Sequence, residues 1–335
     1  MKNRLFTLVF AVIAALSIIT LTACDKGAES QVNLVGISSG ADVVARDDID
    51  YFVVPEPAAS LRVKAAGLHF VGDLQKLYGG ENGYPQAVIV VKNDLLNSDG
   101  DFVKAFVDGV KANKSWLETA EISTVVNAVN NHLTDGMMPI FDANNLTKSV
   151  IDNCGIRFTS ASESKAETKS FLSSLKAIQP SVKDDPADGF FFDGNFAQTS
   201  DESKTQVSVY APDGAPALAI ANLLAGEVQF SKTVNYEIVN AQLIQNFVTG
   251  NAQADICILP VNLASNLLGT NKNYTMLGTV THGNLYILSA KDEGEITLDK
   301  LKGKTVAVVN LGAVPGLTLK LILKNNGLEY AENAE

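Results

Sequence analysis

The chain has 335 residues, of which 46% are hydrophobic and 19% are charged, and its formal net charge at pH 7 is −11. Such an acidic chain is a poor partner for nucleic acid or for an anionic lipid surface. Its length accommodates two modest domains, and its three cysteines are too few for a disulfide framework.

The first segment predicts an export signal. Two basic residues precede an apolar run from Leu5 to Thr20, and the sequence Leu-Thr-Ala then leads into Cys24. This pattern resembles a lipobox, in which the cysteine is acylated after the signal is removed. Residues 1–23 are therefore predicted to be a lipoprotein signal peptide and 24–31 a tether, with an uncleaved membrane anchor or an ordinary signal peptide as alternatives. A lipid on Cys24 implies an extracytoplasmic protein anchored to the cell membrane.

The next stretch predicts part of an α/β domain. A strand is expected from Val32 to Ile37, followed by a polar turn that opens a short helix. Asp50 to Pro55 is an apolar run opened by an aspartate and closed by a proline, which is typical of a buried parallel strand. Pro57 to Ala66 has the proline at the start that suits a helix. A glycine-rich loop follows at 79–85.

A strand at Gln86 to Lys92 is predicted to cross into the other half of the molecule. From Asp101 to about Gly194 the apolar spacing predicts helices, with the apolar stripe as core packing. Residues 196–205 are polar without periodicity and are predicted to be a linker.

The third part of the chain repeats the first. Asp255 to Ser265 has the same pattern as Asp50 to Ser60: aspartate, apolar strand, proline, then Ala-Ser at the same offset. The expected elements are strands at 207–210, 234–239, 255–260, 276–280 and 285–288, and helices at 216–225, 241–249 and 261–268. A second crossing strand is expected at 285–291. Cys257 lies in one of these strands and is interpreted as a small core residue.

The last part repeats an earlier unit as well. Val306 to Pro315 aligns with Val207 to Pro216, each being a strand, a glycine-containing turn and a helix. The units of one half run in order, whereas those of the other half are divided between the two ends of the chain. The chain is therefore predicted to be circularly permuted. The predicted lobes are 32–84 plus 297–335 (lobe 2) and 85–195 plus 206–296 (lobe 1).

These repeated units resemble the substrate-binding lipoproteins of ABC importers, of the kind that serve thiamine precursors, sulfonates, taurine and nitrate. The resemblance rests on Ala254 to Ala264, Gly278 to Leu288, Asp299 to Val306, Asp50 to Pro57 and Gly83 to Leu95. It implies a two-lobe α/β fold of the type II periplasmic-binding-protein class, with two hinge strands. It also implies a monomer that closes on a small molecule and is recognised by permease subunits, without a cofactor or metal.

The ligand is expected between the lobes, at the turns that follow the repeated strands, because helix N-termini present free N–H groups there. Tyr84, beside a hinge strand, is expected to stack on a flat ligand. The complete set of expected ligand-binding residues is Asp213, Gly214, Ala215, Asn262, Thr281, His282, Ser38, Ser39, Glu56, Tyr84, Gly312, Ala313 and Val314.

Each of these residues also has a purely structural interpretation. The glycines permit turns, the serines cap a helix, and Glu56 is a first-turn carboxylate. Two carboxylates, Glu56 and Asp213, with no arginine at these turns favour a neutral or amine-bearing heterocycle over nitrate or a sulfonate.

Two other classes of function remain as alternatives. The first is an enzyme of the same fold, but the three histidines have no neighbouring ligands at metal-binding spacing, and Gly-x-Ser-x-Gly is absent from the sequence. The second is a surface lipoprotein that binds another protein, which predicts an open apolar patch instead of a closing cleft.

Overall fold

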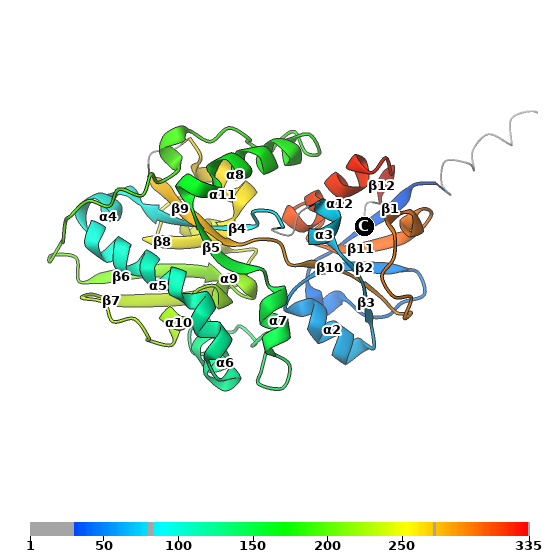
Figure 1. Cartoon of the computed structure of the whole chain (residues 1–335), viewed down its shortest axis with the longest axis horizontal. Coiled ribbons are helices and arrows are strands. Elements are labelled where there is room, and N and C mark those ends of the chain that lie inside the picture. The colour runs from blue at the N-terminus through cyan, green and yellow to red at the C-terminus, as the bar shows by residue number, and fades with distance from the viewer. Residues whose placement is uncertain (1–29, 80–82, 271–272, 334–335) are drawn as a thin grey trace, which may run out of the picture.

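The computed structural model describes residues 30–79, 83–270 and 273–333; the predicted signal peptide and the predicted lipidation of Cys24 lie outside this range. The chain forms two six-stranded sheets flanked by helices, which lie side by side as two lobes (Figure 1). The predicted two-lobe α/β class is therefore confirmed. No helix in the described part of the chain is long and apolar enough to cross a membrane.

Sheet A combines the two ends of the described chain. Its strand order is β12-β1-β11-β2-β10-β3, in which β10 alone runs antiparallel to its neighbours. The bounds of the strands are β1 Val32–Ile37, β2 Tyr51–Pro55, β3 His69–Asp73, β10 Leu285–Ser289, β11 Thr305–Val309 and β12 Tyr330–Asn333.

Sheet B is built from the middle of the chain. Its order is β5-β9-β4-β8-β6-β7, with β6 parallel to both β7 and β8, and β4 antiparallel to both β8 and β9. The bounds are β4 Ala87–Lys92, β5 Ile156–Ser160, β6 Gln206–Pro212, β7 Thr233–Val239, β8 Ile256–Pro260 and β9 Tyr274–Thr281.

Five strands of each sheet are topologically equivalent. The sequence β1-β11-β2-β10-β3 in sheet A has the same directions as β7-β6-β8-β4-β9 in sheet B. In each set of five, the antiparallel strand is preceded along the chain by a strand of the other sheet. β4 of sheet B follows β3 of sheet A, and β10 of sheet A follows β9 of sheet B. The predicted boundary at residue 296 assigns β10 to lobe 1. In the structure β10 pairs with β2 and therefore belongs to sheet A, the sheet of lobe 2.

Helices cover both faces of each sheet. In the view of Figure 1, α8, α11, α3 and α12 lie above the sheets, whereas α5, α6, α10 and α2 lie below or in front of them. The bounds are α2 Ala58–Ala66, α3 Leu74–Tyr78, α4 Asn93–Ser98, α5 Gly100–Thr119, α6 Ile122–Asn130, α7 Lys148–Asn153, α8 Ala161–Lys176, α9 Ala215–Leu218, α10 Ala221–Leu224, α11 Val261–Leu268 and α12 Val314–Asn325.

The largest hydrophobic core joins the two lobes. It includes Leu34 and Leu319 from the sheet A side and Phe171 and Leu268 from the sheet B side. The opposite face of sheet B has its own core beneath α5, α6 and α10, and the opposite face of sheet A has a smaller core beneath α2. Burial of apolar side chains on both faces explains why the central strands read as continuous apolar runs.

The aspartates that open the repeated segments make equivalent contacts. Asp255 Oδ2 accepts a hydrogen bond from Ser208 N–H at 3.0 Å, and its Oδ1 accepts from Lys204 Nζ at 3.0 Å. Asp50 Oδ2 accepts from Thr305 N–H at 2.9 Å, and its Oδ1 from Lys304 Nζ at 3.1 Å. Each aspartate therefore ties the start of its strand, β8 or β2, to the neighbouring parallel strand. The repeated aspartates therefore have a structural role. They lie where their strands begin, at the sheet edge opposite to the turns that follow the strands.

Three segments differ from the sequence-based expectation. Residues 101–194 are not entirely helical, because Ile156–Ser160 pairs with β9 as the edge strand β5. The expected helix at 216–225 is split into α9 and α10 at Ile220. The expected helix at 241–249 is a single 3-10 turn, Ile244–Phe247. Two strands near the ends, β3 and β12, were not predicted, because each is short and has no continuous apolar run.

The expected linker at 196–205 has no regular structure, but it is held in place. Thr199 Oγ1 donates to the carbonyl of Asn97 and accepts from Gly100 N–H, both at 3.1 Å. Lys232 Nζ donates to the carbonyl of Lys204 at 2.6 Å. This segment therefore packs along the α4–α5 junction as part of the lobe.

Two crossing segments connect the lobes, one between α3 and β4 and the other between β9 and β10. Close contacts at these segments involve three glycines with positive φ, two in the crossing segments and one between α7 and β5. A Cβ at Gly83 (φ +68°) would lie 2.2 Å from the carbonyl oxygen of His282, and one at Gly155 (φ +63°) would lie 2.2 Å from that of Gly283. Gly283 (φ +74°) packs in turn against Gln75. Only glycine fits these positions, since both the backbone conformation and the space exclude a side chain.

Candidate functional site

The turns that follow the parallel strands of the two sheets face one another. Gln242 Nε2, after β7, donates to the carbonyl of Ser38, after β1, at 3.4 Å. A Cβ at Gly214, after β6, would lie 3.6 Å from Cδ of Pro57, after β2. The structure therefore brings the two sets of predicted turns to one interface, as expected for the carboxyl edges of open α/β sheets.

Asp213 lies at this interface, immediately after β6. Burial raises the pKa of its carboxyl from 3.8 to about 6, although the N–H of Ala241 lowers it in part. No cation in the described part of the chain contributes to this pKa or forms an ion pair with Asp213. A carboxylate that has lost water without gaining a cation favours a ligand that brings a positive charge or hydrogen-bond donors.

Glu56 is the second carboxylate and is 2% exposed. Its Oε2 accepts from Ser60 N–H at 2.9 Å and its Oε1 from Ser60 Oγ at 2.6 Å, so it caps the first turn of α2. Asn153 Nδ2, at the end of α7 in the other lobe, lies 3.4 Å from Oε1. Burial raises the pKa of Glu56, and the bonds from Ser60 and Asn153 lower it in part.

Three side-chain amide oxygens on the facing edges have no hydrogen-bond partner among the described residues. They belong to Gln86 at the start of β4, Asn262 in the first turn of α11, and Asn284 just before β10. Asn284 is 3% exposed, and its Nδ2 already donates to the carbonyl of Glu56 at 2.8 Å. Buried acceptors without donors are uncommon and destabilising. The edges are thus rich in acceptors.

Several predicted site residues are used in other ways. Ser39 Oγ accepts from Ala41 N–H at 3.1 Å and caps a 3-10 turn, and Thr281 Oγ1 accepts from Ala87 N–H at 3.1 Å. Tyr84 is fully buried; its ring stacks on Phe171 with centroids 5.3 Å apart. The ring of Tyr84 is therefore not free to stack on a ligand as the sequence suggested.

The remaining predicted residues shape the turns. Gly214 has φ +84°, which favours glycine, and leads into Ala215 at the start of α9. Ala313 precedes α12, whose first residue, Val314, is buried, whereas Gly312 is exposed. These residues present backbone groups, and their side chains offer no specific chemistry to a ligand.

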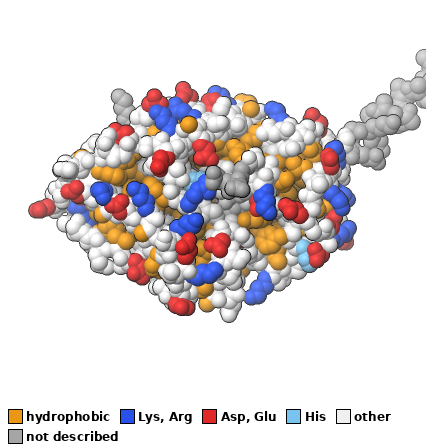
Figure 2. All heavy atoms as spheres, viewed as in Figure 1, with side chains coloured by type: hydrophobic (Ala, Val, Ile, Leu, Met, Phe, Trp, Pro, Cys, Tyr) orange, Lys and Arg blue, Asp and Glu red, His pale blue; other side chains and the backbone are white. Residues whose placement is uncertain are grey.

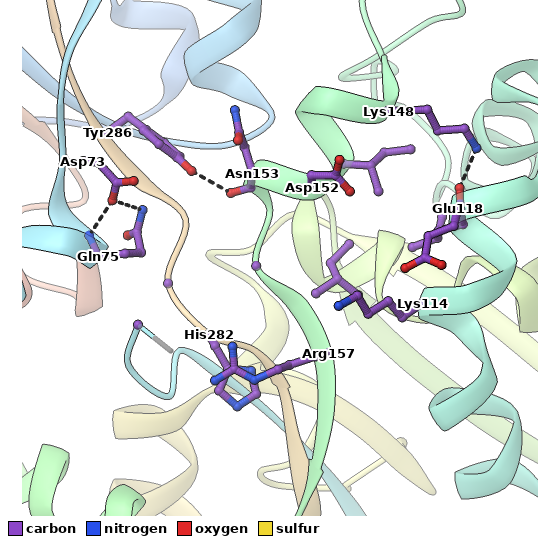
Figure 3. A pocket seen from close by; sticks show the side chains of 16 residues that line it. Asp73, Gln75, Lys114, Glu118, Lys148, Asp152, Asn153, Arg157, His282 and Tyr286 are labelled. Atoms are coloured by element: carbon purple, nitrogen blue, oxygen red, sulfur yellow. Dashed lines mark hydrogen bonds between the residues drawn. The ribbon is translucent and has the colours of Figure 1, made fainter. Parts of the chain in front are cut away.

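A cavity of about 440 Å³ lies beside the crossing segments. Figure 3 shows side chains from both lobes around it. Of the predicted site residues, only His282 is in its wall; the other lining residues are Asp73, Gln75, Gly83, Lys114, Leu117, Glu118, Lys148, Ile151, Asp152, Asn153, Gly155, Ile156, Arg157, Gly283 and Tyr286.

Sequence reasoning missed Arg157, which the structure places near His282. Arg157 belongs to β5, whose start pairs with the end of β9 just before His282. Burial, together with the nearby Arg157, lowers the pKa of His282 to about 3, so its imidazole is neutral at physiological pH. No local pattern could reveal this proximity, because the two residues lie far apart in the sequence and β5 itself was not predicted.

Metal and thiol chemistry find no support in the described residues. There, no group of three or more His, Cys, Asp or Glu side chains is arranged to hold a metal ion. Cys154 and Cys257 are both buried and unpaired, and burial raises the pKa of each thiol. A raised thiol pKa lowers the thiolate fraction and with it the reactivity.

Comparisons with known proteins yield only weak likenesses. No family model and no curated protein matches the chain. Two solved structures of a periplasmic oligopeptide-binding protein of an oligopeptide ABC transporter from Thermotoga maritima, one with mannohexaose bound, are 16% identical, with TM-scores of 0.21 and 0.22. The match covers 63% of this chain and 35% of either structure. At these TM-scores the likeness transfers neither fold nor function to this chain.

Proposed function

We propose that this protein is an extracytoplasmic solute-binding lipoprotein that captures a small molecule between its lobes and delivers it to an ABC importer. The observation that carries the proposal is that the two sheets have equivalent topology and that the turns after their parallel strands face one another. The chain passes from one sheet to the other before β4 and again before β10. Two lobes joined in this way can open and close about the crossing segments. The lipid on Cys24 would hold the protein at the membrane, where the permease subunits would recognise its closed form.

The solute proposed is neutral or amine-bearing, and an aminopyrimidine is an example. Asp213 and Glu56 supply carboxylates at the facing edges, and Gln86, Asn262 and Asn284 supply unpartnered amide oxygens. A ligand rich in N–H donors would satisfy these acceptors, whereas a nitrate or sulfonate would meet further negative charge. On the face in Figure 2, acidic and basic side chains are interspersed, and the net charge of the chain is −11, which disfavours an anionic ligand further.

A thermal-shift screen of the chain from Asp25 onward tests this function. The ligands are aminopyrimidines, other vitamin precursors, taurine, alkanesulfonates and nitrate. A true ligand at about one hundred times its Kd adds about 2.7 kcal/mol to the folded state and raises Tm by several degrees. Tight binding of nitrate or taurine, with no response to any aminopyrimidine, would contradict the proposed ligand class.

A matched pair of variants locates the site. Asp213→Asn is expected to weaken binding of an amine-bearing ligand about tenfold to a hundredfold, because a charge-assisted hydrogen bond is lost. Asp193→Asn changes an exposed carboxylate that bonds only within its own turn, to Asn195, and should leave the affinity unchanged. Equal affinities for the two variants would place the ligand elsewhere.

A further inference from the structure

The two crossing segments end in an amide side chain at equivalent positions. Gln86 comes immediately before β4, and Asn284 comes immediately before β10. The residue after Gln86 lies opposite Pro260, the last residue of β8, and the residue after Asn284 lies opposite Pro55, the last residue of β2. Because β4 and β8 occupy the same places in sheet B as β10 and β2 in sheet A, Gln86 and Asn284 are counterparts in the two lobes.

Backbone hydrogen bonds repeat this equivalence. The carbonyl of Gln86 accepts from Val261 N–H at 2.9 Å, and the carbonyl of Asn284 accepts from Glu56 N–H at 2.8 Å. Both donors follow the proline that closes a repeated apolar run. Gln86 N–H also donates to the carbonyl of Thr281 at 3.0 Å, on the segment that leads to Asn284. Gln86 is thus fixed at the facing edge of sheet B, and Asn284 at that of sheet A, where the crossing segments run together.

Each of these two side chains has a buried oxygen that accepts no hydrogen bond from the described residues, Oε1 in Gln86 and Oδ1 in Asn284. Asn284 is 3% exposed, and its Nδ2 donates to the carbonyl of Glu56 at 2.8 Å, so the orientation of its amide is fixed. A buried acceptor without a donor is uncommon and costly. A donor supplied by a ligand would remove this cost at both positions.

The cavity of about 440 Å³ adjoins this region. Its wall includes Gly283, the residue before Asn284, and Asn153, whose Nδ2 lies 3.4 Å from Glu56 Oε1. Tyr286, also in the wall, donates its hydroxyl to the carbonyl of Asn153 at 3.2 Å (Figure 3). The cavity and the facing edges therefore belong to one region, and the volume is in the range of small-molecule pockets.

We propose that Gln86 and Asn284 are the specificity-determining pair of the solute site, and that the solute is a planar molecule with N–H donors on two opposite sides. This assignment rests on the proposed function, because it names groups that recognise the solute. An amide oxygen only accepts, so a molecule that presents acceptors to both positions is rejected. A solute bonded to both oxygens contacts both lobes, and such contacts favour the closed form.

Isothermal titration calorimetry with a graded series of heterocycles tests the pair. The compounds are a diaminopyrimidine, the two aminopyrimidines that lack one or the other amino group, and pyrimidine itself. The diaminopyrimidine should bind most tightly, and loss of either amino group should weaken binding about tenfold, because one hydrogen bond is lost each time. Failure of the whole series at about 10 mM would overturn the proposal, as would equal affinities across it.

Variants connect each amino group to one side chain. Gln86→Met has a similar volume and no amide oxygen, so it should weaken binding of the diaminopyrimidine about tenfold. One of the two amino groups should then be dispensable, and Asn284→Leu should make the other dispensable. Gln229→Met is the control, because Gln229 is exposed and bonds within its own turn, to the carbonyl of Gly226. Asn284 also holds Glu56, so its variant is the one that can fail to fold; Gln86→Met tests the pair without it.

A general disturbance of the fold by Gln86→Met would weaken all compounds alike, whereas loss of a specific acceptor removes the preference for one amino group only. A variant that keeps the preference for both amino groups would therefore refute the pair. Binding of a different solute from the thermal-shift screen, unchanged in Gln86→Met, would also refute the pair but leave the importer role standing.

Discussion

Asp213 is expected to destabilise the ligand-free protein at neutral pH, and its replacement by asparagine should relieve this. The pKa of Asp213 is raised from 3.8 to about 6 by burial. The folded state therefore holds a proton more tightly than the unfolded state, and stability falls as pH rises from about 4 through 6. At 1.36 kcal/mol per unit, the loss above pH 6 is about 3 kcal/mol. Asp213→Asn should remove this loss while abolishing the carboxylate that a ligand would need.

Urea unfolding followed by the fluorescence of Trp116 measures this effect. Trp116 is the only tryptophan and lies on α5, in the same lobe as Asp213. The quantity of interest is the free energy of unfolding at pH 4 minus that at pH 8, compared between the natural chain and the variant, so that other titrating groups cancel. The variant should show a difference smaller by up to about 3 kcal/mol. Equal differences, or a variant less stable at pH 8, would refute the reasoning.

Two further pairs of substitutions test the framework. Asp255→Ala should lower the free energy of unfolding, measured in urea, by about 2–3 kcal/mol, because the Ser208 N–H and a nearby lysine lose their acceptor. Asp50→Ala should lower it by only about 1 kcal/mol, because the side chain of Asp50 is 36% exposed. Equal costs would argue against burial as the deciding factor. Gly83→Ala should cost about 3 kcal/mol or more and Gly79→Ala about 1 kcal/mol, since both have positive φ but only Gly83 meets another backbone. A tolerated Gly83→Ala, measured by thermal melting, would mean that the crossing segments are not tightly packed.

Apolar runs were the most informative part of the sequence for the fold. The repeated runs at Asp50 and Asp255 correspond to β2 and β8, which occupy equivalent positions in the two sheets. Short strands without such runs were missed, and β5 is an example, because Ile156–Ser160 carries arginine, threonine and serine. It becomes a strand only through pairing with β9, which is a tertiary effect.

The candidate site was less accessible from the sequence. Turn positions could be located because they follow recognisable strands, so the sequence placed Asp213 and Glu56 at the ends of β6 and β2; their role in binding stays a prediction. The burial of Tyr84 against Phe171 could not be foreseen, since an aromatic residue beside a hinge strand suits either core or ligand. Likewise, the groups around the cavity converge from α5, α7, β5 and the crossing segments, and no local spacing connects them.

Sheet A joins the first and last parts of the chain, and this has a consequence during synthesis. The strand β2 pairs with β10 and β11, which are made more than 200 residues later. Until then, a wholly apolar segment has no partner strand and remains open to association with other chains. Sheet B, by contrast, has all its strands once Thr281 has emerged. A chain shortened at its C-terminus should therefore still assemble sheet B. Its β2 would lack partner strands in sheet A, so this apolar segment should bind holdase chaperones.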